Sequence, residues 1–85
     1  MSAYRVAVHI LPRFGLLDPQ GKAVADALRT LEFGGVRDVR VGRHVVITTE
    51  AGGPDDAVDA ARAMCERLLA NPVTEDFEIA GVEKE

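Results

Sequence analysis

The sequence predicts an α+β fold whose elements follow the order β-α-β-β-α-β. Three observations lead to this order. Side chains in residues 4–11 alternate with the two-residue period of a strand. Apolar residues recur at helical spacing in residues 19–32 and again in residues 57–69. A hairpin pattern lies between these two helical segments, and a strand pattern follows the second one.

Length and composition bound the class of protein. The chain has 85 residues, of which 47% are hydrophobic, which suits one small domain spanning residues 1–85 with a modest core. The net charge is −4 and Lys and Arg form no run, so we expect no nucleic-acid partner and no membrane partner. A single cysteine, Cys65, allows no internal disulfide, and no apolar run is long enough for a membrane span or a signal peptide. We therefore expect a cytoplasmic protein.

The first strand is expected to bury one face and to end at Pro12, which lacks a backbone donor. Its apolar face consists of Tyr4, Val6, Val8 and Ile10. The opposite face carries Arg5, Ala7, His9 and Leu11.

The segment Leu17-Asp18-Pro19-Gln20-Gly21-Lys22 marks the start of the first helix. Asp18 is suited to cap the free amides of the first turn, and Pro19 has its φ preset for the first helical position. Gly21 within that turn costs about 0.5–1 kcal/mol against alanine unless another group approaches the backbone closely. The segment is therefore either a well-capped helix start or a place where something packs against Gly21. Gly34-Gly35 is expected to end the helix with left-handed backbone.

Residues Val36 to Glu50 are interpreted as a hairpin. Gly42-Arg43 fits a two-residue type II′ turn, which would pair residue 41 with residue 44. A turn one residue longer gives a different register, and the sequence leaves both open. Gly52-Gly53-Pro54 precedes the second helix, and Asn71-Pro72 ends it.

The last strand is expected over Val73 to Val82, followed by a frayed tail of residues 83–85. The resulting topology is ferredoxin-like, with a four-stranded antiparallel sheet and two helices on one face. The other face of this sheet would carry Ala7 and Leu11 without a cover. Exposed apolar surface of this kind indicates a second copy or a partner, so we expect a dimerising protein.

Residues with catalytic chemistry are sparse. His9 and His44 lie on different predicted strands without a hydroxyl or thiol at a recognisable spacing, which favours interface or solvent roles. Cys65 falls in the apolar stripe of the second helix and is interpreted as a core residue. No phosphate-binding glycine motif occurs. We therefore expect no catalytic, cofactor-binding or metal-binding residue in this chain.

A cluster of arginines at positions 37, 40 and 43 surrounds Asp38. These side chains are suited either to local ion pairs or to a partner's carboxylates or a ligand phosphate. RNA-recognition modules share the predicted topology, but the acidic balance and the lack of aromatic residues in the middle strands disfavour that function.

Three ordered stretches carry a resemblance to a known family. The first is residues 17–21 followed by Ala23-Val24 and Ala27-Leu28, the second is residues 36–43, and the third is residues 64–73 followed by residues 75–77. Together they resemble the small subunit, PurS, of phosphoribosylformylglycinamidine synthase, over almost the whole chain. The departures are Arg43 in place of the usual lysine and Phe77 in place of a common tyrosine. A site that needs a compact ammonium would not be reproduced by arginine.

The resemblance implies a non-catalytic accessory subunit of an ATP-dependent ligase of the amidotransferase type in purine (IMP) biosynthesis. In that family a glutaminase subunit (PurQ) releases ammonia, and a synthetase subunit (PurL) uses ATP and Mg to add it to formylglycinamide ribonucleotide (FGAR). The product is formylglycinamidine ribonucleotide (FGAM). The small subunit, as a homodimer or higher oligomer, is expected to bridge the two others, to assist ammonia transfer and to bind no cofactor itself.

The resemblance also implies a set of partner-interface residues at turns and helix ends. These are Asp18, Gln20, Gly21, Asp38, Arg40, Arg43 and Asn71. Two other classes of function stay open at this point. One is an ACT-like regulatory domain that binds a small molecule, and the other is a thiol enzyme acting through Cys65.

Overall fold

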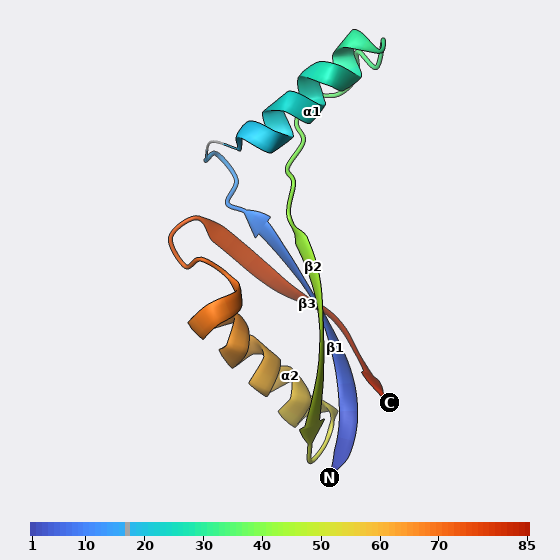
Figure 1. Ribbon diagram of the computed structural model, residues 1–85, viewed down its shortest axis with the longest axis vertical. Helices are drawn as coiled ribbons and strands as arrows, with labels where there is room; N and C mark the ends of the chain where they lie inside the picture. The colour runs from blue at the N-terminus through green and yellow to red at the C-terminus, as the bar shows by residue number, and fades with distance from the viewer. Residues whose placement is uncertain (17) are drawn as a thin grey trace.

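The structure is a computed structural model that describes residues 1–16 and 18–85. Leu17, the first residue of the helix-start segment, lies outside the described residues. The elements are β1 (Ser2–Pro12), α1 (Pro19–Thr30), β2 (Arg43–Ala51), α2 (Pro54–Met64) with a π-helical turn at Cys65–Leu69, and β3 (Glu75–Lys84). Figure 1 shows two parts, a sheet covered by α2 and a helix α1 that projects beyond the end of the sheet.

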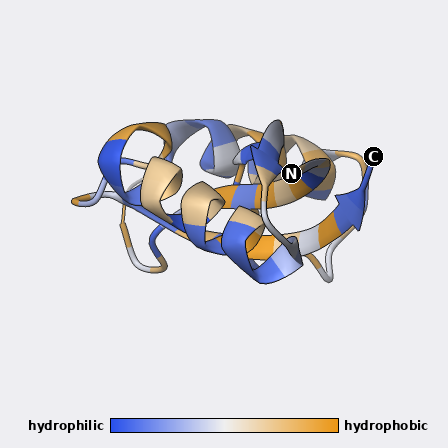
Figure 2. Ribbon diagram, turned by 90° about the horizontal axis from the view of Figure 1, so that it is seen from below, coloured by the Kyte–Doolittle hydropathy of each residue, from blue (hydrophilic) through white to orange (hydrophobic). Residues whose placement is uncertain are grey.

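The described strands form one antiparallel sheet in the order β2-β1-β3. The predicted apolar face of β1 is confirmed, because Val6, Val8 and Ile10 are fully buried and Tyr4 is 8% exposed. Hydrophobic and hydrophilic positions alternate along the strands in Figure 2. β1 has a strand on either side and supplies the largest buried side chains, so the core is centred on it.

Helix α2 covers the apolar face of the sheet with small side chains. Ala57, Ala61 and Cys65 are fully buried against it. Small residues let the helix axis approach the strands closely, which gives a thin core. The predicted strand face of β3 is also confirmed, since Phe77 and Ile79 pack against this core while Asp76 and Glu78 are exposed.

The prediction of a four-stranded sheet with a hairpin at Gly42-Arg43 is wrong. Residues 36–42 form no strand among the described residues, and β2 starts at Arg43 and pairs directly with β1. The physical reason is that side chains satisfy the backbone of this segment. Arg29 donates to the carbonyl oxygens of Val36 (3.1 Å) and Arg37 (3.4 Å), in place of a neighbouring strand.

The prediction of two helices on one sheet face is also wrong, because only α2 lies on the sheet (Figure 1). Helix α1 runs along residues 36–41 instead, and the molecule is elongated, with principal extents of 52 × 26 × 13 Å. One side of α1 is closed off by this segment, where Gly21 and Ala25 are buried. Most of its other apolar side chains are exposed, including Val24 at 41% and, at the C-cap, Leu31 at 66%.

Helix α1 ends in a Schellman motif whose left-handed residue is Glu32, with φ 75°, rather than the predicted Gly34-Gly35. The amide of Phe33 donates to the carbonyl of Leu28 (3.0 Å), and the amide of Glu32 donates to the carbonyl of Arg29 (3.0 Å). The tail also differs from the expected fraying. Glu83 and Lys84 belong to β3 and pair with β1, and the amide of Glu85 donates to Ala3 (2.9 Å).

The left-handed conformation of Glu32 predicts a stabilising substitution. Glu32→Gly relieves the Cβ clash of this conformation, and we expect the free energy of unfolding to rise by about 0.5–1 kcal/mol. Thr30→Gly, in the regular last turn, should instead lower it by at least about 0.3 kcal/mol. Urea unfolding of the two variants and the wild type measures both changes. A Glu32→Gly variant less stable than the wild type would contradict the role of the left-handed residue.

Candidate functional site

The connection between β1 and α1 and the segment returning to β2 form an elbow, which we define as residues 12–22 (Leu17 excepted) and 36–42. Asp18 joins its two halves. One carboxylate oxygen of Asp18 accepts from the amide of Gly21 (3.1 Å), and the other accepts from the amide of Val41 (3.0 Å). These hydrogen bonds, that from Val41 first, lower the pKa of Asp18 below its usual value. The predicted helix cap is confirmed, and it also holds the returning chain.

Two glycines let backbone segments meet in the elbow. A Cβ on Gly21 would overlap the carbonyl oxygen of Val39, and a Cβ on Gly42 would overlap that of Ile10. The alternative in which something packs against Gly21 is therefore the one that the structure favours, together with the cap. The direction of α1 relative to the sheet is set by these close contacts.

A second fixed cluster joins the start of β2 to the turn before β3. Arg43 makes a bidentate ion pair with Glu75 (3.0 and 3.1 Å) and donates to the carbonyl of Leu69 (2.7 Å). Glu75 also accepts from the amide of Asn71 (2.8 Å). The amide of Asn71 and the guanidinium of Arg43 lower the pKa of Glu75. This fork geometry suits arginine and would not be reproduced by a lysine.

The remaining charges of the predicted interface lie at the outside of the elbow. Arg40 stands over the ring of Phe14, with its guanidinium carbon 5.7 Å from the ring centroid, and its Nε lies 3.9 Å from Asp38. Gln20 is exposed on the first turn of α1. A hollow of about 410 Å³ opens here between the β1–α1 turn, the start of α1 and the returning segment. It is lined by Phe14, Gly15, Leu16, Asp18, Lys22, Arg37, Asp38, Val39 and Arg40.

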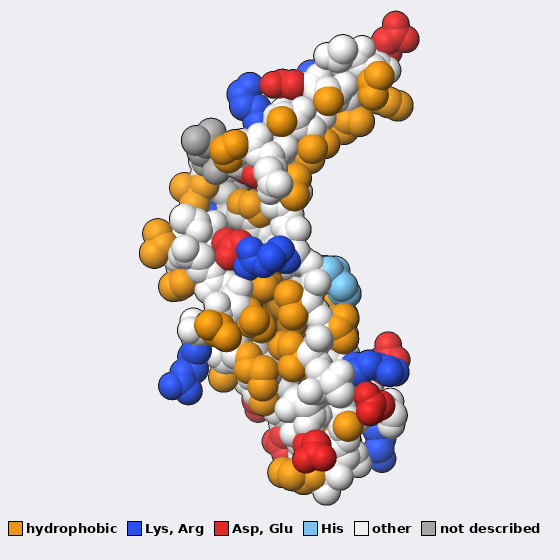
Figure 3. Space-filling model, viewed as in Figure 1, with side chains coloured by type: hydrophobic (Ala, Val, Ile, Leu, Met, Phe, Trp, Pro, Cys, Tyr) orange, Lys and Arg blue, Asp and Glu red, His pale blue; other side chains and the backbone are white. Residues whose placement is uncertain are grey.

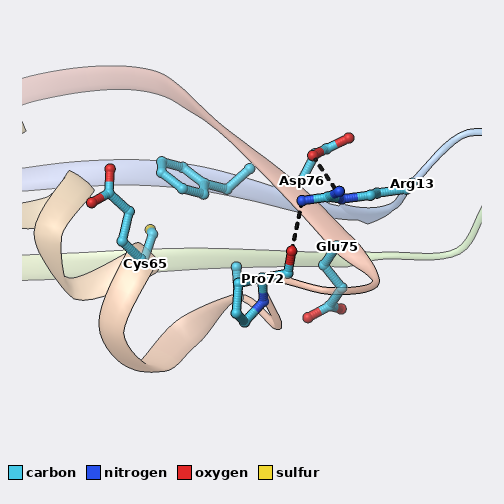
Figure 4. A pocket seen from close by; sticks show the side chains of 8 residues that line it. Arg13, Cys65, Pro72, Glu75 and Asp76 are labelled. Atoms are coloured by element: carbon cyan, nitrogen blue, oxygen red, sulfur yellow. Dashed lines mark hydrogen bonds and ion pairs between the residues drawn. The ribbon is translucent and has the colours of Figure 1, made fainter.

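A second hollow, of about 270 Å³, lies where α2 ends (Figure 4). Arg13 reaches across it, donates to the carbonyl of Pro72 (2.6 Å) and pairs with Asp76 (3.3 Å). Cys65 contributes to its wall, but the residue is fully buried, and this burial raises the pKa of the thiol. A buried, protonated thiol is a poor nucleophile, which disfavours the thiol-enzyme alternative.

The face of the sheet away from α2 carries the two histidines. The rings of His9 and His44 have centroids 4.9 Å apart, and His9 Nδ1 lies 3.5 Å from Glu78. Val46 on this face is 54% exposed. Among the described residues no group of three or more His, Cys, Asp or Glu side chains could hold a metal ion. None of the described helices is long and apolar enough to cross a membrane.

The structure thus separates the predicted interface residues into groups. Asp18 and Gly21 form the inside of the elbow, while Gln20, Asp38 and Arg40 lie on its outside. The other two, Arg43 and Asn71, belong to the cluster around Glu75. Their contacts with a partner stay predictions. Sequence reasoning missed Phe14 and Leu16, because apolar residues in a loop form no periodic pattern; the structure shows that both side chains are exposed.

These features define a small α+β protein with exposed apolar side chains on α1 and an elbow at which charged and aromatic side chains meet. Residues 5–83 match the family model PurS, described as phosphoribosylformylglycinamidine (FGAM) synthase. The chain belongs to the PurS family, which confirms the resemblance drawn from its three sequence motifs.

Individual relatives agree over nearly the full length of the chain. The phosphoribosylformylglycinamidine synthase subunit PurS of Bacillus subtilis is 42% identical over 74 residues, which is 87% of both chains. The structure of PurS from Thermus thermophilus superposes with a TM-score of 0.85 at 36% identity, covering 98% of both chains. A chain in the structure of PurLQS from Thermotoga maritima gives a TM-score of 0.82 at 28% identity, covering 100% of both.

The close approach at Gly21 predicts a severe effect of a single methyl group. Gly21→Ala places its Cβ against the Val39 carbonyl, and we expect a loss of about 1–3 kcal/mol in the free energy of unfolding. Gly34→Ala is the matched control, because a Cβ there meets nothing within 4 Å and its φ is not positive. Thermal unfolding of both variants tests the contact. Equal unfolding temperatures of the two variants would show that the elbow accommodates the methyl group and that the contact at Gly21 does not fix the direction of α1.

Proposed function

We propose that this chain is the small, non-catalytic subunit of an ATP-dependent phosphoribosylformylglycinamidine synthase of purine biosynthesis. In this function it joins a glutaminase subunit to a synthetase subunit, in the cytoplasm. The observation that carries the proposal is the family match over residues 5–83. The likeness to a chain of the PurLQS structure, at full coverage of both chains, supports assembly with the PurL and PurQ subunits.

The chemistry assigned to this chain is exclusion of water rather than bond formation. Ammonia released from glutamine is protonated in bulk water and then no longer attacks an activated substrate. A bridging subunit prevents this when it buries the space between two active sites, and it needs no reactive group for that purpose. ATP and Mg²⁺ would act in the synthetase subunit, which would activate the substrate for attack by ammonia.

We further propose that the functional form is a dimer in which α1 packs on a second copy. The exposed side of α1 carries Val24, Leu31 and the following Phe33, which are 41%, 66% and 57% exposed. Figure 3 shows hydrophobic side chains along α1 and a second group over the sheet and α2. Exposure of an apolar stripe to water is unfavourable, so we expect another protein surface to pack against this stripe.

The sheet of a second copy offers the matching surface. Helix α2 alone covers the apolar face, and Val45 and Ile47 on β2 are only partly buried beside it. This is the place that the second helix of a ferredoxin-like fold would occupy. The elbow directs α1 away from the sheet of its own chain (Figure 1), so a helix from a second copy is suited to fill that place. A twofold axis would let each chain supply α1 to the other.

The dimer proposal predicts a change of oligomeric state on charging the stripe. Leu31→Glu buries a carboxylate in the proposed contact, and we expect sedimentation at micromolar concentration to show a monomer where the wild type is a dimer. Val46→Glu, an exposed valine on the other sheet face, is the control and should remain a dimer. A Leu31→Glu chain that sediments as the wild type would remove α1 from the interface.

The functional proposal predicts a donor-specific requirement for this chain. FGAM formation by the purified synthetase and glutaminase subunits is measured with glutamine and, separately, with ammonium salt as nitrogen donor. We expect glutamine-dependent synthesis to fall at least about tenfold when this chain is left out, and ammonia-dependent synthesis to stay within about twofold. Equal dependence of both rates on this chain would contradict a role confined to ammonia transfer, and independence of both would contradict the subunit function.

A further inference from the structure

We propose that the outer surface of the elbow docks a carboxylate-bearing segment of another subunit in the assembly. We define this docking surface as Phe14, Leu16, Lys22, Arg37 and Arg40. The inference rests on the proposed function, because it assigns a partner contact to a specific place on the chain. It adds Phe14, Leu16 and Lys22 to the residues that the sequence associates with partners, and it selects the partner-carboxylate alternative for Arg37 and Arg40.

Two large apolar side chains are presented on this surface by a fixed turn. Phe14 is 81% exposed and Leu16 is 48% exposed. The amide of Leu16 donates to the carbonyl of Arg13 (3.2 Å), and the amide of Arg13 donates to the carbonyl of Thr74 (2.8 Å). The guanidinium of Arg13 also binds the next turn through the carbonyl of Pro72. The turn is therefore held against the body of the molecule while its apolar side chains point away from the core.

Aromatic residues and arginine are the side chains most often responsible for binding energy at protein interfaces. Here Arg40 lies over the ring of Phe14 at 5.7 Å, which combines both types in one unit. Its Nη1 is also within 3.4 Å of the carbonyl of Pro12, so the stack is tied to the end of β1. Little side-chain entropy would be lost on binding a partner, because the contact between Arg40 and Phe14 already exists in the free chain.

The charges around the hollow select the chemistry of the partner. The chain as a whole carries −4, yet the hollow is lined by three cations, Lys22, Arg37 and Arg40. Lys22 is already paired with Asp26 on its own helix (3.2 Å), so the two arginines supply most of the positive charge for a partner. It is also lined by two carboxylates, but the oxygens of Asp18 are occupied by the amides of Gly21 and Val41. That leaves Asp38, 3.9 Å from Arg40, as the only other carboxylate in the lining of the described hollow. The side chain of Arg37 has no ion pair among the described residues, so it is available for a carboxylate of the partner.

The shape of the elbow is set before binding. Asp18 joins both halves of the hollow, and Gly21 and Gly42 keep the backbones in contact. Preorganised hollows with an apolar anchor and a charged wall favour specific docking over diffuse attraction. The surface is also distinct from the apolar stripe of α1 and from the sheet face that carries His9 and His44. One chain can therefore dimerise and hold another subunit at the same time.

The test uses matched pairs of variants at exposed positions. Phe14→Ser removes the apolar anchor, and Val46→Ser makes the same kind of change on the outer sheet face. Arg37→Glu reverses a charge in the hollow, and Arg62→Glu reverses an exposed arginine on α2. Circular dichroism and sedimentation of all four variants first establish that fold and oligomeric state equal those of the wild type.

Binding is then measured by interferometry against the purified synthetase and glutaminase subunits together, with glutamine present. We expect Phe14→Ser and Arg37→Glu to raise Kd by about tenfold or more, and the two controls to change it by less than about twofold. The affinity of the wild type should fall with added salt, and that of Arg37→Glu should fall less. Failure of the wild type to bind would overturn the proposed function and the inference with it.

Other results would overturn the inference alone. If the wild type binds and both elbow variants bind equally well, the docking surface lies elsewhere on the chain. If the elbow variants lose self-association instead, the surface belongs to a second copy. If all four variants weaken binding to the same extent, the partner is attracted by the whole surface of the chain and the hollow is not a specific docking site.

Discussion

The carboxylate of Asp18 accepts hydrogen bonds from the amides of Gly21 and Val41, and this shared acceptor orients the rest of the chain. One bond starts α1, and the other holds the segment that returns from it to β2. With Gly21 packed against the Val39 carbonyl, the two backbones cannot separate without losing both contacts. Helix α1 is thereby directed away from its own sheet, which leaves one apolar side of the helix and part of the sheet face without an intramolecular partner. In this account the tendency to assemble follows from a local capping contact.

Local patterns predicted the parts of the fold that depend on short-range chemistry. The period of β1, the cap at Asp18 and the stripe of α2 are each specified by neighbouring side chains, and the structure contains all three. The missing strand shows where this reasoning stops. Residues 36–42 have a strand-like composition, but Arg29 and Asp18 satisfy their backbone groups across the elbow. A local sequence pattern does not reveal that the side chain of Arg29 on α1 binds carbonyl oxygens of residues 36 and 37. It also does not reveal that α1 lies beyond the sheet.

The candidate site divides in the same way. Asp18 and Gly21 were identified from turn chemistry, and their contacts inside the elbow are now visible. The role of Arg43 was open in the sequence, because a charge cluster does not reveal which carboxylate it meets; the structure joins it to Glu75, far away in the chain. A single aromatic residue in a loop forms no periodic pattern, so the sequence does not mark Phe14 as a candidate. Its exposure and its contact with Arg40 in the structure indicate an interface residue.

The central claim is that α1 completes the sheet of another chain rather than its own. Isotope-filtered NMR on a mixture of labelled and unlabelled chains tests it directly, through contacts between Leu31 on α1 and Val45 or Ile47 on β2. We predict cross-peaks that arise only between a labelled and an unlabelled chain, because α1 projects beyond the end of its own sheet (Figure 1). Cross-peaks of the same pairs within a single monomeric chain would show that α1 folds back on its own sheet, and would contradict the account.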